Sequence, residues 1–560
     1  MSGMVAYGGP RPMKPASPPA RGHSVWRVFA HRVFFALWIA ALVSNVGTWM
    51  QNVGAAWLMT SLSPSPLMVA LIQTASSLPI LLLALPAGAL ADIVDRRRLL
   101  IVSQAWMLLA AAALGVFTIE NLMTPWMLLG LSFALGVGSA LNAPAWQAIT
   151  PELVPPEDLT SAIALNGVNF NAARAVGPAI GGIVVAWAGA GATFVLNAVS
   201  FLGVMVVLYG WNRSLQPGVL PAERLIGAIR SGLRYVRYAP PLRAVMMRTA
   251  GFTIGASAVW AIVPLLARHQ LNLGADGFGL LLGAFGAGAI VAGAALERIE
   301  DFASRDTIVA ASTAIFAAVL IGLGFSSSYA PALALMFVGG AMWVLANSSL
   351  NIAAQLSVPR WVQGRALACY QLVQQAAVAG GSVLWGFAAE HGGVPLSLVL
   401  AAITMVSGLV PMIFFHLISD DELDLDPLPL PPVPEPASHV DPESGPVLVT
   451  IEYLIRPESA REFRAAMNAI RSIRLRDGAI FWGLFFDLAR PERFVEYFIS
   501  ESWIEHMRMH GRGVSSDQEL EARARAFHIG SSPPAVTHQL SAHATVERSN
   551  WLFRDLVELP

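Results

Sequence analysis

The sequence predicts an all-α polytopic membrane protein with twelve transmembrane helices in two six-helix halves, followed by a soluble α+β domain. Three observations support this prediction. First, 55% of the 560 residues are hydrophobic and 13% are charged, whereas soluble domains carry about 25% charged residues. Second, apolar stretches of about 20 residues, the length that crosses a bilayer, recur from residue 34 to residue 418. Third, the chain becomes ordinary soluble sequence at the strand-like alternation from Val447 to Ile455.

Turn sequences such as Ser63-Pro64-Ser65-Pro66 separate the apolar stretches. The expected spans are residues 34–60, 66–91, 98–119, 124–148, 161–187, 190–211, 243–267, 277–297, 306–325, 330–356, 364–389 and 395–418. They form an N-terminal half, residues 34–211, and a C-terminal half, residues 243–418. The loop between them, residues 212–242, has apolar positions at helical spacing with arginines between, which predicts an amphipathic helix over 222–238 on the inner leaflet.

The charged turn at the end of Pro86–Arg98 orients the chain. Its last three residues are arginines between two apolar spans, so this turn must lie in water. With the N-terminus inside, nineteen Lys and Arg residues fall in inner segments and only Arg268 falls in an outer loop. We therefore expect a multi-pass protein of the bacterial inner (plasma) membrane with both termini in the cytoplasm. Residues 1–33 are expected to form a disordered cytoplasmic N-terminal tail, of which residues 1–24 are rich in Pro, Gly and Ala.

The two halves show weak internal similarity. Residues 156–162 parallel residues 359–365, and Asp92 parallels Glu297 at a similar offset. Two related halves around a midplane cavity are typical of transporters. No G-x-x-x-x-G-K-[ST] motif is present, which argues against transport driven by ATP. We expect a small-molecule substrate and the lipid bilayer as partners, and no nucleic acid.

One charge is expected near the middle of the membrane. Arg174 lies about 20 Å along the fifth span at 1.5 Å per residue, and a charge inside a membrane indicates function by default. It could bind a substrate anion, or it could hydrogen-bond helix carbonyls in a structural role. The acids between residues 34 and 418 all fall in loops or at helix ends, so no proton carrier is evident. Asp276 and Glu390, near the outer helix ends, are weak candidates.

Uncharged amides are frequent in the expected spans. Amides in lipid need partners, so they face other helices or a cavity. Each one singly is more often a contact between helices. As a set with Trp49 and Trp57 they predict a wet cavity for a polar, partly aromatic molecule. Besides Arg174, the candidate cavity residues are Asn45, Gln51, Asn142, Asn169 and Gln371.

The C-terminal segment is expected to form a separate cytoplasmic domain. Residues 419–446 are acidic and Pro-rich, as in a semi-extended linker. Residues 447–560 follow with a β-α-β-β-α-β order, which predicts a ferredoxin-like α+β fold. His506 and His510 have the i, i+4 spacing that a metal pair would have. Because no third ligand has convincing spacing, we expect packing histidines, and no metal, cofactor or catalytic residue.

The loop Gly88-x-Leu90-Ala91-Asp92, followed by Arg96 and Arg97, resembles the signature loop of the major facilitator superfamily. The chain departs from that pattern at Ile93, where a basic residue is usual, and at Asp95, where glycine is usual. The resemblance implies the major facilitator fold and a conformational clasp formed by Gly88, Asp92, Arg96 and Arg97. We expect Gly88 to let two helices approach closely. The other interpretation is a charged turn that only sets topology.

Gly177-Pro178 and Gly181-Gly182 resemble the antiporter motif of exporters in this superfamily, although small residues can also serve helix packing alone. The stretch from Val43 to Met59 resembles the enterobactin exporter-like, or transmembrane secretion effector, group. These resemblances imply a secondary-active exporter of a small amphipathic molecule, siderophore-like or drug-like, working by alternating access.

The segment Trp503-Ile504-Glu505-His506 is distantly similar to dimeric α/β-barrel monooxygenases of antibiotic biosynthesis. This likeness favours a regulatory or dimerising domain that allows self-association. The alternative is a transporter–enzyme fusion whose C-terminal domain modifies or senses the substrate.

Overall fold

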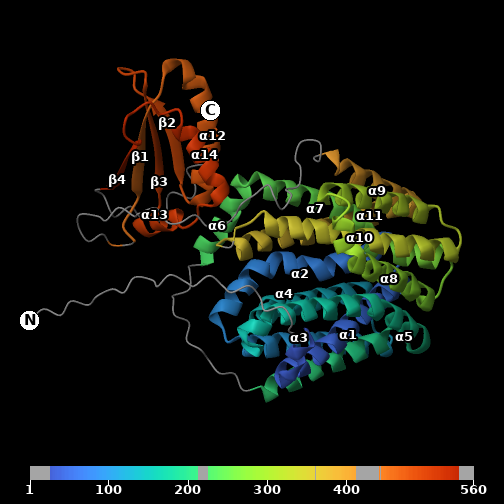
Figure 1. Cartoon of the computed structure of the whole chain (residues 1–560). Helices are drawn as coiled ribbons and strands as arrows, with labels where there is room; N and C mark the ends of the chain where they lie inside the picture. The colour runs from blue at the N-terminus through green and yellow to red at the C-terminus, as the bar shows by residue number, and fades with distance from the viewer. Residues whose placement is uncertain (1–24, 212–224, 360, 411–440, 442, 542–560) are drawn as a thin grey trace, which may run out of the picture.

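The structure, a computed structural model, describes residues 25–211, 225–359, 361–410, 441 and 443–541. A bundle of long helices forms the larger part, and a small α/β domain lies beyond one end of it, next to the short helix α6 (Figure 1). The bundle helices are α1 (Arg32–Leu62), α2 (Pro66–Ile93), α3 (Arg96–Ile119), α4 (Pro125–Leu153), α5 (Leu159–Gly210), α6 (Leu225–Tyr238), α7 (Pro240–Leu265), α8 (Ala275–Glu300), α9 (Arg305–Gly324), α10 (Tyr329–Leu356) and α11 (Gln363–Ser407).

Ten of the described helices are long and apolar enough to cross a membrane, by length and composition. Two of them contain a break that the sequence places between spans. Helix α5 has 52 residues and a non-helical Gly189 with φ of 78°, and α11 has 45 residues and a non-helical Gly393, also with φ of 78°. A positive φ of this size favours glycine because a Cβ atom would clash there. The expected span 395–418 is described only as far as residue 410.

Local sequence explains the starts of three bundle helices, α2, α3 and α4. Ser65 and Thr124 cap α2 and α4 by accepting hydrogen bonds from the backbone N–H of Met68 and Met127. Both helices then begin with proline, which lacks the N–H that the first turn cannot use. Asp95 caps α3 in the same way, by accepting from the N–H of Arg98. The charged turn before α3 is therefore also a helix start signal.

The bundle consists of two helical groups, α1–α5 and α7–α11, which meet along α2 with α11 and α5 with α8. A Cβ atom on Gly182 of α5 would lie 2.5 Å from the Cα of Gly279 on α8. A Cβ atom on Gly386 of α11 would lie 2.5 Å from the Cβ of Ala70 on α2. Small residues thus bring the two groups into backbone contact, as in other membrane helix pairs.

The C-terminal domain is an antiparallel sheet with helices on one face (Figure 1). Its four strands lie in the order β2-β3-β1-β4. Side chains alternate along β3, and Phe494, Glu496 and Phe498 point into the core. The elements are β1 (Val447–Leu454), α12 (Ala460–Asp477), β2 (Phe481–Phe486), β3 (Arg493–Ser500), α13 (Trp503–His510), α14 (Ser515–Arg525) and β4 (Ala535–Leu540). The predicted order is present, with two short helices before the last strand.

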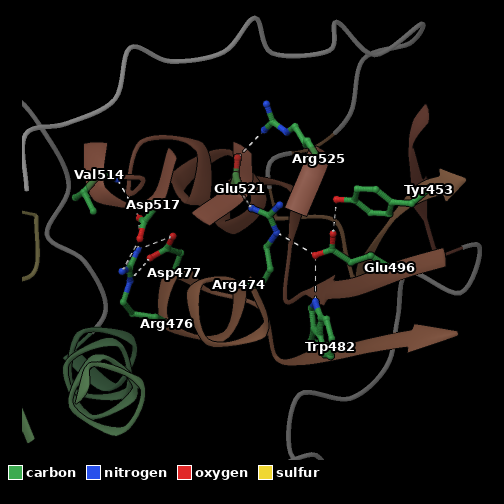
Figure 2. Close-up of polar contacts among 10 residues, drawn as sticks. All are labelled: Tyr453, Arg474, Arg476, Asp477, Trp482, Glu496, Val514, Asp517, Glu521 and Arg525. Atoms are coloured by element: carbon green, nitrogen blue, oxygen red, sulfur yellow. Dashed lines mark hydrogen bonds and ion pairs between the residues drawn. The ribbon is translucent and has the colours of Figure 1, made fainter. Parts of the chain in front are cut away.

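A buried ionic network joins α12 of this domain to β3 and α14 (Figure 2). Glu496 is fully buried and accepts hydrogen bonds from Tyr453 Oη at 3.1 Å, Arg474 Nε at 3.2 Å and Trp482 Nε1 at 3.1 Å. Arg474 also donates to Glu521 Oε1 at 2.7 Å. Burial, and then the charge of Glu496, raise the pKa of Tyr453, so this hydroxyl stays a donor. The network satisfies a carboxylate that could not otherwise be buried.

The second part of this network, also drawn in Figure 2, lies beside it on the same helix. Arg476 donates to its neighbour Asp477 at 2.8 Å and to Asp517 Oδ2 at 2.6 Å. Asp517 in turn accepts from the backbone N–H of Val514 at 3.1 Å. These contacts tie the start of α14 to the end of α12.

Helix α6 lies between this domain and the turn from α10 to α11. Tyr235 is buried, and its hydroxyl donates to the carbonyl of Ser357 at 2.9 Å. Tyr238 packs against the core of the C-terminal domain. The C-terminal domain also contacts the bundle directly. The guanidinium carbon of Arg512, just after α13, lies 4.7 Å from the ring centre of Trp361, in the turn between α10 and α11. Tyr235 and Tyr238 of α6 therefore pack on protein, whereas Leu233 is exposed, and the placement of the apolar face on the inner leaflet stays a prediction.

Candidate functional site

A cavity of about 1430 Å³ lies between the two helical groups. Its lining comes from α1, α2, α4 and α5, with Met107 of α3, on one side and from α7, α8, α10 and α11 on the other. Amide side chains supply much of its polarity. Those that line it are Asn45, Gln51, Asn52, Gln73, Gln147, Asn171, Asn197, Asn347, Asn351, Gln371, Gln374 and Gln375. Among the described lining residues there is no aspartate or glutamate.

Arg174 lies in this cavity inside a cage of three tryptophans. Its guanidinium carbon is 3.7 Å from the ring centre of Trp343, 5.7 Å from Trp49 and 5.9 Å from Trp260. These rings come from α10, α1 and α7, so the cage joins the two helical groups. Indole faces attract cations. No described residue hydrogen-bonds or ion-pairs with the guanidinium, so its N–H groups keep their capacity to donate.

The expected cavity residues divide into two sets. Gln51 and Gln371 line the cavity, as Arg174 and Asn45 do. The Gln51 side chain is also fixed, because its Oε1 accepts a hydrogen bond from Asn197 Nδ2 at 2.6 Å. The amides of α1 and α5 thereby position each other at the cavity wall.

Asn142 and Asn169 do not line the cavity, which corrects the prediction for both. Asn169 is buried, accepts from Asn45 Nδ2 at 3.0 Å and donates to the carbonyl of Trp38 at 2.7 Å. Asn142 accepts from Gln104 Nε2 at 3.2 Å, which joins α4 to α3. Both amides use their hydrogen bonds between helices, where an unpaired amide would be unfavourable.

Sequence reasoning missed Trp260 and Trp343 as site residues. Both lie in predominantly apolar spans, and an aromatic residue in such a span gives by itself no sign of the direction it faces. The polar neighbours Asn347 and Asn351, one and two turns after Trp343, share its helix face. That spacing is the one signal that could have placed Trp343 in the cavity.

The cavity extends toward the end of the bundle that carries Arg96–Arg98, here called the basic end. On α5 the lining begins at Ala164, five residues after the helix starts at Leu159. On α8 it reaches Leu296, close to the helix end at Glu300. The cavity is therefore open toward the basic end.

Direct contacts close the bundle at its other end, here called the opposite end. Arg268 donates to Thr60 Oγ1 at 2.9 Å and to Ser61 Oγ at 2.5 Å. Glu390 accepts from Ser65 Oγ at 2.8 Å and from the N–H of Leu67 at 3.3 Å. Both contacts join the second helical group to the first. Glu390 thus caps α2 in this conformation and is not a cavity residue.

The expected clasp residues lie at the basic end. Arg96 donates to Glu152 Oε1 at 2.8 Å and to the carbonyl of Ala148 at 3.1 Å. Arg97 donates to the carbonyls of Leu208 and Tyr209 at 2.7 and 2.8 Å, which caps the end of α5. The described contacts of these arginines stay within the first helical group. The side chain of Asp92 lies outside the described residues.

Gly88 does not make the close helix contact that was predicted. A Cβ atom at this position would meet nothing within 4 Å. The contacts of α2 with α11 are made nearer the start of α2, where Thr74 donates to the carbonyl of Ala379 at 3.0 Å. Because the cavity opens at the basic end, Gly88 has no helix backbone beside it here.

The glycines of the antiporter-like motif do lie at close contacts. A Cβ atom on Gly177 would lie 2.6 Å from the Cβ of Trp49, and one on Gly181 would lie 2.8 Å from the Cα of Met50. Gly182 faces α8, and Pro178 is buried between these contacts. The motif therefore packs α5 against α1 on one side and against the second helical group on the other.

Two helical groups around a polar central cavity define the class of protein as a membrane transporter with the major facilitator fold. The chain belongs to the transmembrane secretion effector family, which it matches over residues 23–546. It is 21% identical over 374 residues to the staphyloferrin A transporter of Staphylococcus aureus, covering 66% of this chain and 93% of that protein. It is 24% identical over 399 residues to the multidrug efflux pump Tap of Mycolicibacterium fortuitum, covering 69% and 96%.

Several solved structures share this fold, and two illustrate it. One is a bacterial homologue of the human lysosomal transporter Spinster in an inward-facing conformation, with a TM-score of 0.54 at 12% identity, covering 70% of this chain and 96% of that one. The other is a transporter of the POT family, with a TM-score of 0.57 at 12% identity, covering 68% and 96%. The comparisons confirm the resemblance to the major facilitator superfamily.

Proposed function

We propose that this protein exports a small, anionic and partly aromatic molecule across the bacterial inner membrane by alternating access. The observation that carries the proposal is Arg174, a cation held by three indole rings in a cavity without a described carboxylate. A lone cation in a membrane cavity is unfavourable unless a ligand anion pairs with it. Arg174 donates through a planar fork that matches carboxylates and similar anions, and the indoles offer stacking to an aromatic group.

The relatives support export as the direction of transport. The enterobactin exporter EntS of Escherichia coli is 25% identical over 290 residues, covering 50% of this chain and 67% of that protein. The staphyloferrin A transporter and the efflux pump Tap are named for small molecules as well. We propose a siderophore-like or drug-like substrate on these grounds. Because the relatives are named as transporters, the transporter–enzyme fusion receives no support and is not proposed.

We propose twelve crossings with both termini in the cytoplasm. Ten apolar helices are described, and α5 and α11 are each long enough for two crossings, since a crossing needs about 20 residues. The breaks at Gly189 and Gly393 support a return of the chain at these points. The arginines at 96–98 support a cytoplasmic position for the basic end. On that orientation the described cavity faces inward, ready to load substrate from the cell.

Two further roles are proposed for the helix ends. Asp92, Arg96 and Arg97 act as a conformational clasp when the basic end closes, and in the described conformation the arginines are held by α4 and α5. Gly182 allows the close packing against α8 that seals the opposite end, while Gly181 packs α5 against α1 within the first helical group. Alternating access would break one set of contacts as the other forms, because packed interfaces have discrete arrangements.

For the C-terminal domain we propose a ferredoxin-like fold and self-association. The strand order β2-β3-β1-β4 with antiparallel neighbours supports the fold. The sheet face away from the helices supports association, because Phe481 and Phe485 stack on Tyr497 there and are 52% and 61% exposed. Exposed aromatic patches of this kind mark interaction sites.

The function is tested by comparing metabolites secreted by a deletion strain complemented with the natural protein, with Arg174→Gln or with Arg243→Gln. Arg243 is exposed at the start of α7 and serves as the matched arginine control. We expect an anionic metabolite with an aromatic group to disappear from the medium in the deletion strain and to return with the natural protein and Arg243→Gln. It should not return with Arg174→Gln at equal expression. Identical media in all strains, or export restored by Arg174→Gln, would contradict the proposal.

A further inference from the structure

Three histidines meet in the C-terminal domain, far from the central cavity. His506 and His510 come from α13, and His538 comes from the edge strand β4. One ring nitrogen from each lies within 4.8 Å of those of the other two. The sequence did not predict that His538 joins this pair, because it lies 28 residues after His510. The pairing of β4 with β1 sets His538 opposite Val449, on the sheet face that α13 covers.

We propose that these three imidazoles form a binding site for a zinc-type divalent cation, with a fourth coordination position left open. The Nε2 atoms of His506 and His510 lie 3.2 Å apart. Two nitrogen ligands at about 2.0–2.1 Å from a tetrahedral ion are separated by about 3.3 Å. The existing geometry of this pair therefore needs little change to hold an ion. Three histidine ligands and one exchangeable position are a known arrangement for zinc.

The burial of His506 supports a ligand at this position. Its side chain is 2% exposed, its Nδ1 has no hydrogen-bond partner among the described residues, and its Nε2 contacts only another imidazole. A buried polar ring left in this state costs folding free energy, and such groups in native proteins call for an explanation. A cation bound between the two Nε2 atoms explains why two imidazole nitrogens face each other there, because a neutral imidazole is a good ligand for zinc-type ions.

The surroundings tolerate the added charge. Arg474 lies near the histidines, but it is ion-paired with Glu496 at 3.2 Å and with Glu521 at 2.7 Å. The exposed side of the cluster is formed by His510 and His538, which are half-buried and give an ion access from water. Binding would join α13 to β4. Helix α13 also carries Glu505, which pairs with Arg512 at 3.1 Å, the residue that lies over Trp361 of the bundle.

The test uses the full-length protein in detergent, purified with a tag that contains no histidine and stripped of metal with a chelator. We expect one Zn²⁺ per chain by titration calorimetry, a higher thermal unfolding midpoint with Zn²⁺, and visible absorption typical of tetrahedral Co²⁺ when Co²⁺ replaces it. His510→Gln and His538→Gln should each weaken Zn²⁺ binding at least about tenfold, because even outer partners of a metal ligand change affinity by about 10–100-fold.

His391→Gln is the control, since this exposed histidine of the bundle bonds only to the carbonyl of Phe387 among the described residues. It should bind Zn²⁺ like the natural protein. Protection of the three histidines from diethyl pyrocarbonate by Zn²⁺ in the unmutated chain tests the site without any substitution. The inference is overturned if Zn²⁺ protects none of them, if no tetrahedral Co²⁺ absorption develops, or if the two variants bind Zn²⁺ as tightly as the control.

Discussion

Arg174 in the helical bundle and Arg474 in the C-terminal domain are both half-buried arginines, but the molecule compensates them in different ways. Arg474 has two carboxylates within 3.2 Å, Glu496 and Glu521. Among the described residues, Arg174 has no carboxylate partner and lies against the faces of three indoles. A charge whose ion-pair partners lie in its own domain needs no ligand, and removal of one partner destabilises the folded domain. A charge that lacks such a partner, in a cavity wide enough for a ligand, is positioned for binding.

The largest expected effect tests the structural side of this comparison. Glu496→Gln leaves Arg474 without its most deeply buried partner, so the domain should lose about 3 kcal/mol or more of its free energy of unfolding. Hydrogen exchange of the β1 and β3 amides in the full-length chain measures the loss. Glu452→Gln is the matched control, because Glu452 pairs with Arg493 on an exposed face and should cost less than about 1 kcal/mol. Equal losses of unfolding free energy in the two variants would show that the buried ion pair of Arg474 stabilises the domain no more than the exposed pair of Arg493.

The second prediction tests the functional side. Arg174→Gln should weaken substrate binding by about 30-fold or more, which corresponds to about 2 kcal/mol for the loss of a buried charged partner. Its thermal unfolding without substrate should change little, unlike that of Glu496→Gln. Quenching of tryptophan fluorescence by the exported metabolite measures binding, and Arg243→Gln is the control. If Arg174→Gln mainly unfolds the protein, Arg174 has the same structural role as Arg474.

The third prediction concerns the seal between the helical groups. Gly182→Val would press against the backbone of Gly279, at a cost of about 1–3 kcal/mol for an overpacked contact. The closed form of the opposite end should become less populated. The reporter is a chain carrying Cys369→Ser and Ser76→Cys. An impermeant thiol reagent added outside cells should label position 76 several-fold faster when this chain also carries Gly182→Val than when it does not. Gly203→Val is the control, because its Cβ would meet open space. Unchanged labelling would show that Gly182 does not limit opening.

The smallest expected effect concerns the cage. Trp343→Leu removes the ring nearest to Arg174 and should weaken substrate binding about fivefold, since a cation–π contact contributes about 1 kcal/mol. Trp187→Leu is the control, because Trp187 is 89% exposed on the outside of the bundle. The same binding measurement applies. A loss as large as that of Arg174→Gln would mean that the indole itself, and not only the charge, holds the substrate.

Much of the fold could be predicted from the sequence because its signals are local. The starts of α2 and α4 lie at Ser65 and Thr124, where a capping residue precedes proline. Val447–Leu454 and Arg493–Ser500 alternate in the sequence and pair in the structure. Gly189 and Gly393, which fall between expected spans, have positive φ. In each case neighbouring residues decide the outcome.

The site was predictable only in part, because it depends on how each helix is rotated. Arg174 is conspicuous as the one charge in a long apolar run. Asn45 and Asn169 look alike in the sequence, yet Asn45 lines the cavity while Asn169 donates to Trp38 and stays buried. Gly88 was expected at a close contact that this conformation does not make. Sequence pattern identifies which residues need a partner and leaves the choice of partner open.

By itself the sequence determined the composition, the apolar spans, the asymmetry of positive charge and the order of elements in the C-terminal domain. Each of these follows from hydrophobicity and turn chemistry along a short stretch of chain. The tertiary structure alone brought Trp260 and Trp343 to Arg174, and His538 to His506 and His510. These residues are far apart in sequence, and only the packing of helices and the pairing of strands sets the distance between them.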